Sequence, residues 1–181
     1  MNSIPVLDSG YVKSVAVSMT QDILRKFKQD VYKGIYKESI LSVPQVTLEI
    51  KCPLFLVISL ASTNLKLYSI INGSSEFYEP TVDEMRTGSH EKDLIIHGHL
   101  SSNIQAAALN SKMYREDGCD GFVASMAAPI SSYWTGYLVG SVADFREFFV
   151  SKSAPSQIKA YQKVIRDIIV AEYPDLEIHL K

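Results

Sequence analysis

The sequence predicts a single α/β domain that spans residues 1–181. Three observations support this class: 46% of the residues are apolar, the mean hydropathy is +0.04, and strand-type and helix-type apolar periodicities both occur. A chain of 181 residues is long enough to enclose a substantial hydrophobic core. We therefore expect a globular fold in which strands and helices share one core.

The central strand is the clearest element. Val46, Leu48 and Ile50 alternate with polar residues, which is the period of a strand with one buried face. Cys52-Pro53 ends the alternation, and the apolar block 54–60 follows. Its β-branched residues favour a buried strand, whereas a proline at the first position favours a helix. These residues alone leave both alternatives open.

The elements before and after this strand follow from local signals. Residues 11–19 alternate as a strand, and Ser18 with Gln21 forms a possible capping box for a helix to Lys33. Residues 80–94 are polar and predict a surface loop or short helix, with Thr81 and Glu84 as a second capping box.

The C-terminal half predicts mainly helices. A helix is expected over 103–116, ended by Gly118, and another from Ala154-Pro155 to Tyr173. Between them, residues 133–149 carry a helical apolar stripe, which we expect to be core or a subunit interface. The aromatic part of this stripe fits an interface: Phe145, Phe148 and Phe149. A short strand is expected over 176–181.

Composition excludes several classes of function. The 18 basic and 20 acidic residues give a net charge of −2, so no general attraction to nucleic acid is expected. The apolar run 53–61 is too short to cross a bilayer, and the first residues do not resemble a signal peptide. We therefore expect a cytoplasmic protein with no nucleic-acid or membrane partner.

No metal site is expected. His97 and His99 could ligate zinc only with further ligands, and Cys119 and Asp120 are the nearest candidates in sequence. The simpler interpretation places both histidines on a turn before a helix. The two cysteines, Cys52 and Cys119, are expected to be reduced and buried.

Several motifs resemble those of the flavin-dependent thymidylate synthases, the ThyX family. Residues 50–55, Ile-Lys-Cys-Pro-Leu-Phe, resemble the family's strand-to-helix corner. Residues 72–78 match part of its signature, with Asn72, Ser75 and Tyr78 on signature positions. Residues 129–133 and 148–155 resemble its Pro-Leu-Ser-Thr-Tyr and Phe-Leu-x-Leu-Arg-x-Ala-Pro segments. The resemblance extends, in matching order, from about residue 12 to residue 173.

The resemblance implies a ThyX-like α/β (α+β) fold, with a central mixed or antiparallel sheet flanked by long helices. It also favours a helix over 54–60 and implies a homotetramer. The family methylates dUMP to dTMP with methylenetetrahydrofolate, FAD and NADPH, and it needs no side-chain nucleophile. Its proteins hold the flavin and polarise the uracil with fixed cationic groups.

The cationic groups of the family are largely missing from this sequence. The Arg-His-Arg triplet is not restored in either alignment register, and Phe77 replaces the arginine before Tyr78. Ser141-Val142-Ala143-Asp144 replaces a segment that touches flavin and nucleotide, and Lys152 replaces a nucleotide-binding arginine. Losing several such contacts together would exceed the binding free energy of a micromolar ligand, about 8 kcal/mol.

We therefore expect a ThyX-like protein that is inactive as a thymidylate synthase and binds a nucleotide or a protein partner on an oligomeric scaffold. No cofactor and no catalytic residue are expected. The alternative is a divergent but active FAD-dependent enzyme. The remaining contacts are predicted from matching positions: Ser75, Tyr78 and Lys152 for a dUMP-like substrate, and Lys66, Asn72 and Ser141 for a cofactor.

Overall fold

The computed structural model describes residues 3–20, 42–71, 76–150 and 154–180. Its centre is a five-stranded sheet in the order β1-β2-β3-β5-β4, in which every neighbouring pair is antiparallel. The strands are β1 (Ile4–Val6), β2 (Gly10–Val17), β3 (Gln45–Pro53), β4 (Lys66–Ile71) and β5 (Tyr133–Ser141). The predicted fold class, with its antiparallel sheet, is confirmed.

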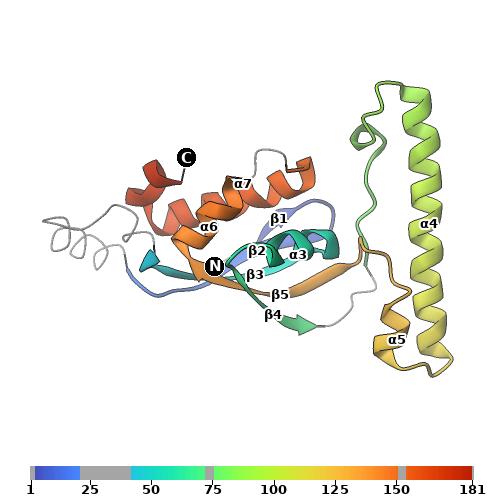
Figure 1. Cartoon of the computed structure of the whole chain (residues 1–181), viewed down its shortest axis with the longest axis horizontal. Coiled ribbons are helices and arrows are strands. Elements are labelled where there is room, and N and C mark those ends of the chain that lie inside the picture. The colour runs from blue at the N-terminus through green and yellow to red at the C-terminus, as the bar shows by residue number, and fades with distance from the viewer. Residues whose placement is uncertain (1–2, 21–41, 72–75, 151–153, 181) are drawn as a thin grey trace, which may run out of the picture.

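The helices differ in length and in position (Figure 1). Within the described residues, the α-helices are α3 (Leu54–Ala61), α4 (His90–Glu116), α5 (Gly121–Ser125), α6 (Val142–Phe149) and α7 (Ser156–Glu172). The 3₁₀ helices there are η1 (Val82–Glu84) and η2 (Pro174–His179). Helices α6 and α7 cover one face of the sheet, whereas α4 stands beside the sheet at one end of the molecule.

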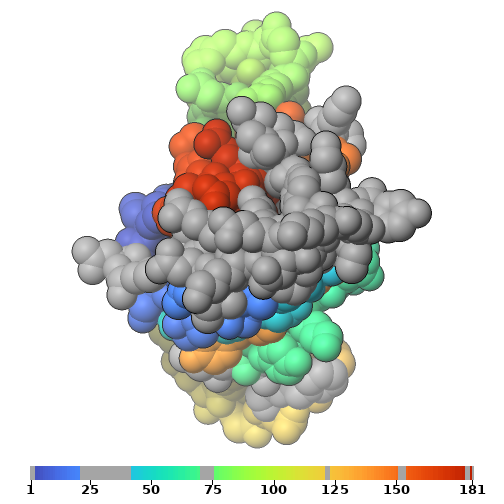
Figure 2. All heavy atoms as spheres, turned by 90° about the vertical axis from the view of Figure 1, so that its left-hand side faces the viewer, coloured from blue at the N-terminus to red at the C-terminus, as the bar shows by residue number. Residues whose placement is uncertain are grey.

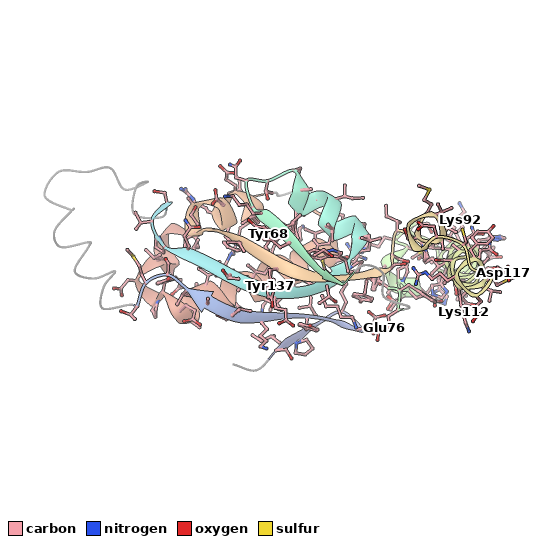
Figure 3. All side chains as sticks on the ribbon, turned by 90° about the horizontal axis from the view of Figure 1, so that it is seen from below. Tyr68, Glu76, Lys92, Lys112, Asp117 and Tyr137 are labelled. Atoms are coloured by element: carbon pink, nitrogen blue, oxygen red, sulfur yellow. The ribbon has the colours of Figure 1, made fainter. Side chains whose placement is uncertain are left out.

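The core lies between the sheet and the helices that cover it. Val46, Leu48 and Ile50 of β3 are fully buried, as their alternation predicted, and they share one core cluster with residues of α3, α6 and α7. The opposite face of the sheet is more exposed. Tyr68 and Tyr137 lie on it, and Figure 3 shows them on neighbouring strands.

Helix α3 resolves the ambiguity of the apolar block after Pro53. The block forms a helix that begins directly after β3, with Pro53 as its N-cap residue. Leu56 and Leu60 are buried on one side, while Ile58 is exposed on the other. The helix therefore forms despite its β-branched residues, because one side of it contributes to the core.

The helix predicted through residues 133–149 is wrong for its first half. Residues 133–141 form β5, which pairs with both β3 and β4, and only Val142–Phe149 is helical. Leu138 is buried from the strand, and Val142 and Phe145 are buried from the helix. Each of these three side chains lies on the core side of its own element. Their spacing along the sequence is therefore the same as in one continuous apolar helix face.

The aromatic side chains of α6 do not form a surface. Phe145, Phe148 and Phe149 are all buried, between 0% and 8% exposed, and belong to the core cluster. The interface predicted from this stripe therefore does not lie there.

Three further predictions need correction. Helix α4 begins at His90, so His97 and His99 lie inside a helix and not on a turn before it. The tail is not a strand, because residues 174–179 form η2.

Cys52 is buried as expected, but Cys119 is exposed; both thiols are free. The helix predicted over 21–33 falls outside the described residues.

Candidate functional site

The predicted site residues that are described do not lie together. Tyr78 donates its backbone N–H to the carbonyl of Ser131, just before β5 begins, at 2.8 Å. Lys66 pairs with Val139 near the other end of β5, and Ser141 ends that strand. A strand of this length separates the two ends by about 27 Å. Asn72, Ser75 and Lys152 fall outside the described residues.

Ser141 caps helix α6. Its hydroxyl accepts a hydrogen bond from the Asp144 N–H at 3.2 Å, and Asp144 accepts one from the Ser141 N–H at 2.7 Å. This is a reciprocal capping box, and it satisfies two backbone donors at the helix start. Ser141 therefore lies at a strand-to-helix junction, whereas the sequence placed it within a helix.

Tyr78 lies in a hydrogen-bonded network that the sequence did not reveal. Its hydroxyl donates to Glu84, 2.6 Å from each carboxylate oxygen. Glu84 also accepts hydrogen bonds from the Thr81 N–H and from the side-chain amide of Gln157, both at 2.7 Å. Because Gln157 belongs to α7, these contacts join the segment before α4 to the main helical layer.

A second set of contacts surrounds the start of β5. The Tyr133 hydroxyl donates to Asp8, and the Lys51 ammonium lies 5.4 Å from the centre of the Tyr133 ring. Lys51 also forms an ion pair with Glu76. The Tyr161 hydroxyl donates to the Lys51 carbonyl at 2.8 Å. The β1–β2 turn, β3, β5 and α7 thus converge at one end of the sheet.

We call these groups the tyrosine cluster. Its members share hydrogen bonds or close charge contacts and come from distant parts of the chain: Asp8, Lys51, Glu76, Tyr78, Glu84, Tyr133, Gln157 and Tyr161.

Burial controls the protonation of the tyrosines. Burial raises the pKa of Tyr78, Tyr133 and Tyr161 well above the ordinary value, and the neighbouring carboxylates raise it further. The three phenols therefore stay protonated at neutral pH and act as hydrogen-bond donors. They are unsuited to serve as general bases there.

The pKa of Glu84 is shifted in the opposite direction, below its ordinary value. Burial alone would raise the pKa of this carboxyl, but hydrogen bonds from Tyr78, the Thr81 backbone and Gln157 outweigh it and lower the pKa. Glu84 is therefore a carboxylate at neutral pH. With Asp8 and Glu76, it gives the cluster three carboxylates against the single ammonium of Lys51.

This charge distribution limits what the cluster can bind. An anion such as a phosphate is held by cationic groups or by converging backbone N–H groups. Here the one ammonium is already paired with Glu76, and the nearest charged neighbour of Tyr78 is a carboxylate. The three tyrosine hydroxyls already donate to Glu84, Asp8 and the Lys51 carbonyl, and the net charge of the cluster repels an anion.

In the described parts of the chain, no group of three His, Cys, Asp or Glu side chains is arranged to hold a metal ion. Burial raises the pKa of the Cys52 thiol, which keeps it protonated and unreactive. Among the same residues, no helix is both long enough and apolar enough to cross a membrane.

Comparison with known proteins gives a structural likeness only. No protein-family profile matches the sequence, and no curated protein matches it. Among solved structures, the fold is similar to that of the UMP/dUMP methylase PolB from Streptomyces cacaoi, solved with bound 5-Br dUMP. The TM-score is 0.68 at 13% identity, and the match covers 98% of this chain and 96% of that one. At this identity the likeness shows a shared fold.

Proposed function

We propose that this protein is a distant ThyX-like protein that does not synthesise thymidylate and acts by binding a nucleotide or a protein partner. The shared fold supports the relationship, since PolB is described as a UMP/dUMP methylase and was solved with a uracil nucleotide. A fold alone does not determine an activity, so the proposal depends on the side chains.

The main support for the proposal is the negative charge around Tyr78. In the ThyX motif this tyrosine follows an arginine, and here it follows Phe77. Its hydroxyl is committed to Glu84, and Asp8 and Glu76 add further negative charge to the cluster. Catalysis on a nucleotide requires fixed positive groups beside developing negative charge. A site with this charge would oppose that stabilisation, and it would hold the phosphate of a bound nucleotide only weakly.

Six residues are the proposed ligand contacts. Ser75, Tyr78 and Lys152 would contact a dUMP-like ligand, and Lys66, Asn72 and Ser141 occupy the positions of cofactor contacts. Ser141 already uses its hydroxyl in a helix cap, which supports the expectation that no flavin is held. We further propose a cytoplasmic homo-oligomer, with four subunits as the resemblance implies.

Binding of dUMP compared with deoxyuridine tests this function, because the two differ only in the phosphate. Thermal unfolding is measured with each ligand, since binding to the folded state raises the melting temperature. The charge of the tyrosine cluster predicts that the phosphate adds no stabilisation, and equal shifts would favour a protein partner over a nucleotide. A larger shift with dUMP than with deoxyuridine would show a working anion site and contradict the charge argument against catalysis, while it would support nucleotide binding. A bound flavin, visible in the absorption spectrum, would favour the active alternative.

A further inference from the structure

Helices α4 and α5 form an arm that packs mainly on itself. The main contacts of α4 with other elements are with α5 and η1, and the Ser111 hydroxyl donates to the Ala124 carbonyl at 2.9 Å. Figure 2 shows both ends of α4 extending beyond the rest of the molecule. We call residues 82–125, which comprise η1, α4 and α5, the arm, and we call the rest of the described chain the body.

The arm has no share in the hydrophobic core of the body. Among the described residues, the core cluster and the side chains packed against it come from positions 6–67 and 134–180, and none comes from the arm. Within the arm, Ile104 and Ala124 are buried. An element with few buried apolar contacts to its surroundings opens at a lower free energy than the core does. Apolar packing therefore holds the arm in place only weakly.

The arm leaves the body and returns to it at one place. Before the arm, the Tyr78 N–H donates to the carbonyl of Ser131, which follows the arm, at 2.8 Å. The residue after Ser131 also accepts a hydrogen bond from the start of α3. The short connections 79–81 and 126–129 run from this place to the arm, as Figure 1 shows. Two adjacent connections without helix or strand structure can act together as one pivot.

Glu84 adds a second tie between the arm and the body, beyond this pivot. It ends η1 and accepts hydrogen bonds from the Tyr78 hydroxyl at 2.6 Å and from the Gln157 side-chain amide at 2.7 Å. Gln157 lies on α7, in the layer of helices that covers the sheet. Hydrogen bonds to a carboxylate are roughly twice as strong as those between neutral groups. These two bonds therefore oppose rotation of the arm about its pivot.

We propose that the arm is a movable unit, and that the bonds from Tyr78 and Gln157 to Glu84 form a latch that holds it in the observed position. Rotation about the two connections leaves the hydrophobic core intact, because no side chain of the core cluster lies on the arm. The movement is thus a hinge opening and not a partial unfolding of the body. Opening would also free the Tyr78 hydroxyl, which is one of the proposed ligand contacts. The latch itself requires no bound nucleotide.

The distance between the arm and the body in solution tests the latch without any ligand. Spin labels are attached at Met113→Cys on α4 and Ile58→Cys on α3, both exposed positions, in a Cys119→Ser background; Cys52 is fully buried. Pulsed electron paramagnetic resonance then gives the distribution of distances, and dilution with unlabelled protein limits it to pairs within one chain. We expect one narrow population in the otherwise unchanged protein.

Glu84→Ala should release the arm. A hydrogen bond to a charged group changes an equilibrium by about tenfold or more, so the loss of both bonds should raise the ratio of open to closed arms about a hundredfold. An open form that holds about 1% of the molecules would then reach about half of them, and the distribution would broaden. A Glu84→Ala distribution as narrow as that of the parent protein would overturn the proposal.

Two controls separate release of the arm from general loosening of the fold. Asp8→Ala removes a matched tyrosine–carboxylate hydrogen bond, with Tyr133, that lies wholly in the body, so it should leave the arm–body distribution narrow. A label pair within the body, Ile58→Cys and Lys163→Cys, should stay narrow in Glu84→Ala, since Lys163 is an exposed position on α7. Broadening of the arm–body distances by Asp8→Ala, or of the body pair by Glu84→Ala, would contradict a latch.

Tyr78→Phe covers the case in which Glu84→Ala does not fold. This substitution removes one hydrogen bond of the latch and keeps the ring, whose centre lies 6.0 Å from that of Phe55. We expect a folded protein in which open arms are about tenfold more frequent than in the parent protein, visible as a second population of distances. A folded Tyr78→Phe protein with a single narrow population would reject the latch.

Discussion

At the scale of single residues, Glu84 joins separate parts of the candidate site, because it accepts hydrogen bonds from Tyr78, Thr81 and Gln157. It was identified in the sequence only as the last residue of a capping box, and the structure confirms that role. Its bonds with Tyr78 and Gln157 could not be predicted, because Gln157 lies 73 positions further along the chain. Tyr78 was found through a motif, but its partners depend on how the segment before α4 packs on α7.

The lowered pKa of Glu84 predicts how stability depends on pH. A carboxyl with a lower pKa in the folded state stabilises the protein above its unfolded pKa, about 4.3, and loses that contribution as the pH falls through the folded value. We expect Glu84→Gln to lower the free energy of unfolding by about 1 kcal/mol at pH 7. The difference from the wild type should shrink toward zero below pH 4.

Urea unfolding of both proteins between pH 3 and pH 7 measures this difference. Asp167→Asn is the control, because Asp167 forms an exposed pair with Lys163 four residues away. Asp167→Asn should lower the free energy of unfolding by less than about 0.5 kcal/mol at any pH. A Glu84→Gln effect that stays constant across the range would show that the carboxylate charge does not stabilise the fold.

At the scale of elements, the sequence predicted those whose buried side has a clear period. Strand β3 and helix α7 were predicted, and the buried side of α7 has helical spacing, with Ile158, Tyr161, Ile165 and Ile168 among its buried residues. Helix α4 was predicted too short, because almost none of its first half is buried and no apolar period marks it. Strand β5 was misassigned because glycines occupy two of its buried positions, which weakens the alternation of apolar and polar residues.

Gly136 of β5 predicts a strong effect of a small substitution. A Cβ there would lie 2.1 Å from the Trp134 ring and 2.5 Å from the backbone carbonyl of Tyr68 on β4. The ring could move, but the carbonyl belongs to the paired strand. We expect Gly136→Ala to destabilise the protein by about 1–3 kcal/mol.

Chemical denaturation measures the Gly136 effect. Thr135→Val on the same strand is the control, because it keeps a β-branched side chain at a partly exposed position. Its free energy of unfolding should stay within about 0.5 kcal/mol of the wild-type value. If Gly136→Ala is as stable as the wild type, the close approach of β4 and β5 at this point is wrong.

At the scale of the whole molecule, the shared fold and the altered charge lead to different expectations about activity. The likeness to PolB extends over almost the entire chain, so the two proteins share one fold. The tyrosine cluster, in contrast, holds three carboxylates and one paired ammonium. The ThyX-like fold could be predicted because strand and helix motifs occur in the expected order. The cluster could not, because its charge arises from residues that only folding brings together.

Formation of dTMP is the most direct test of the central claim. The purified protein is incubated with dUMP, methylenetetrahydrofolate, NADPH and added FAD, and dTMP is measured by chromatography beside an active flavin-dependent thymidylate synthase. The proposal predicts no dTMP above the level without protein. Sustained dTMP formation that depends on this protein and on FAD would contradict it.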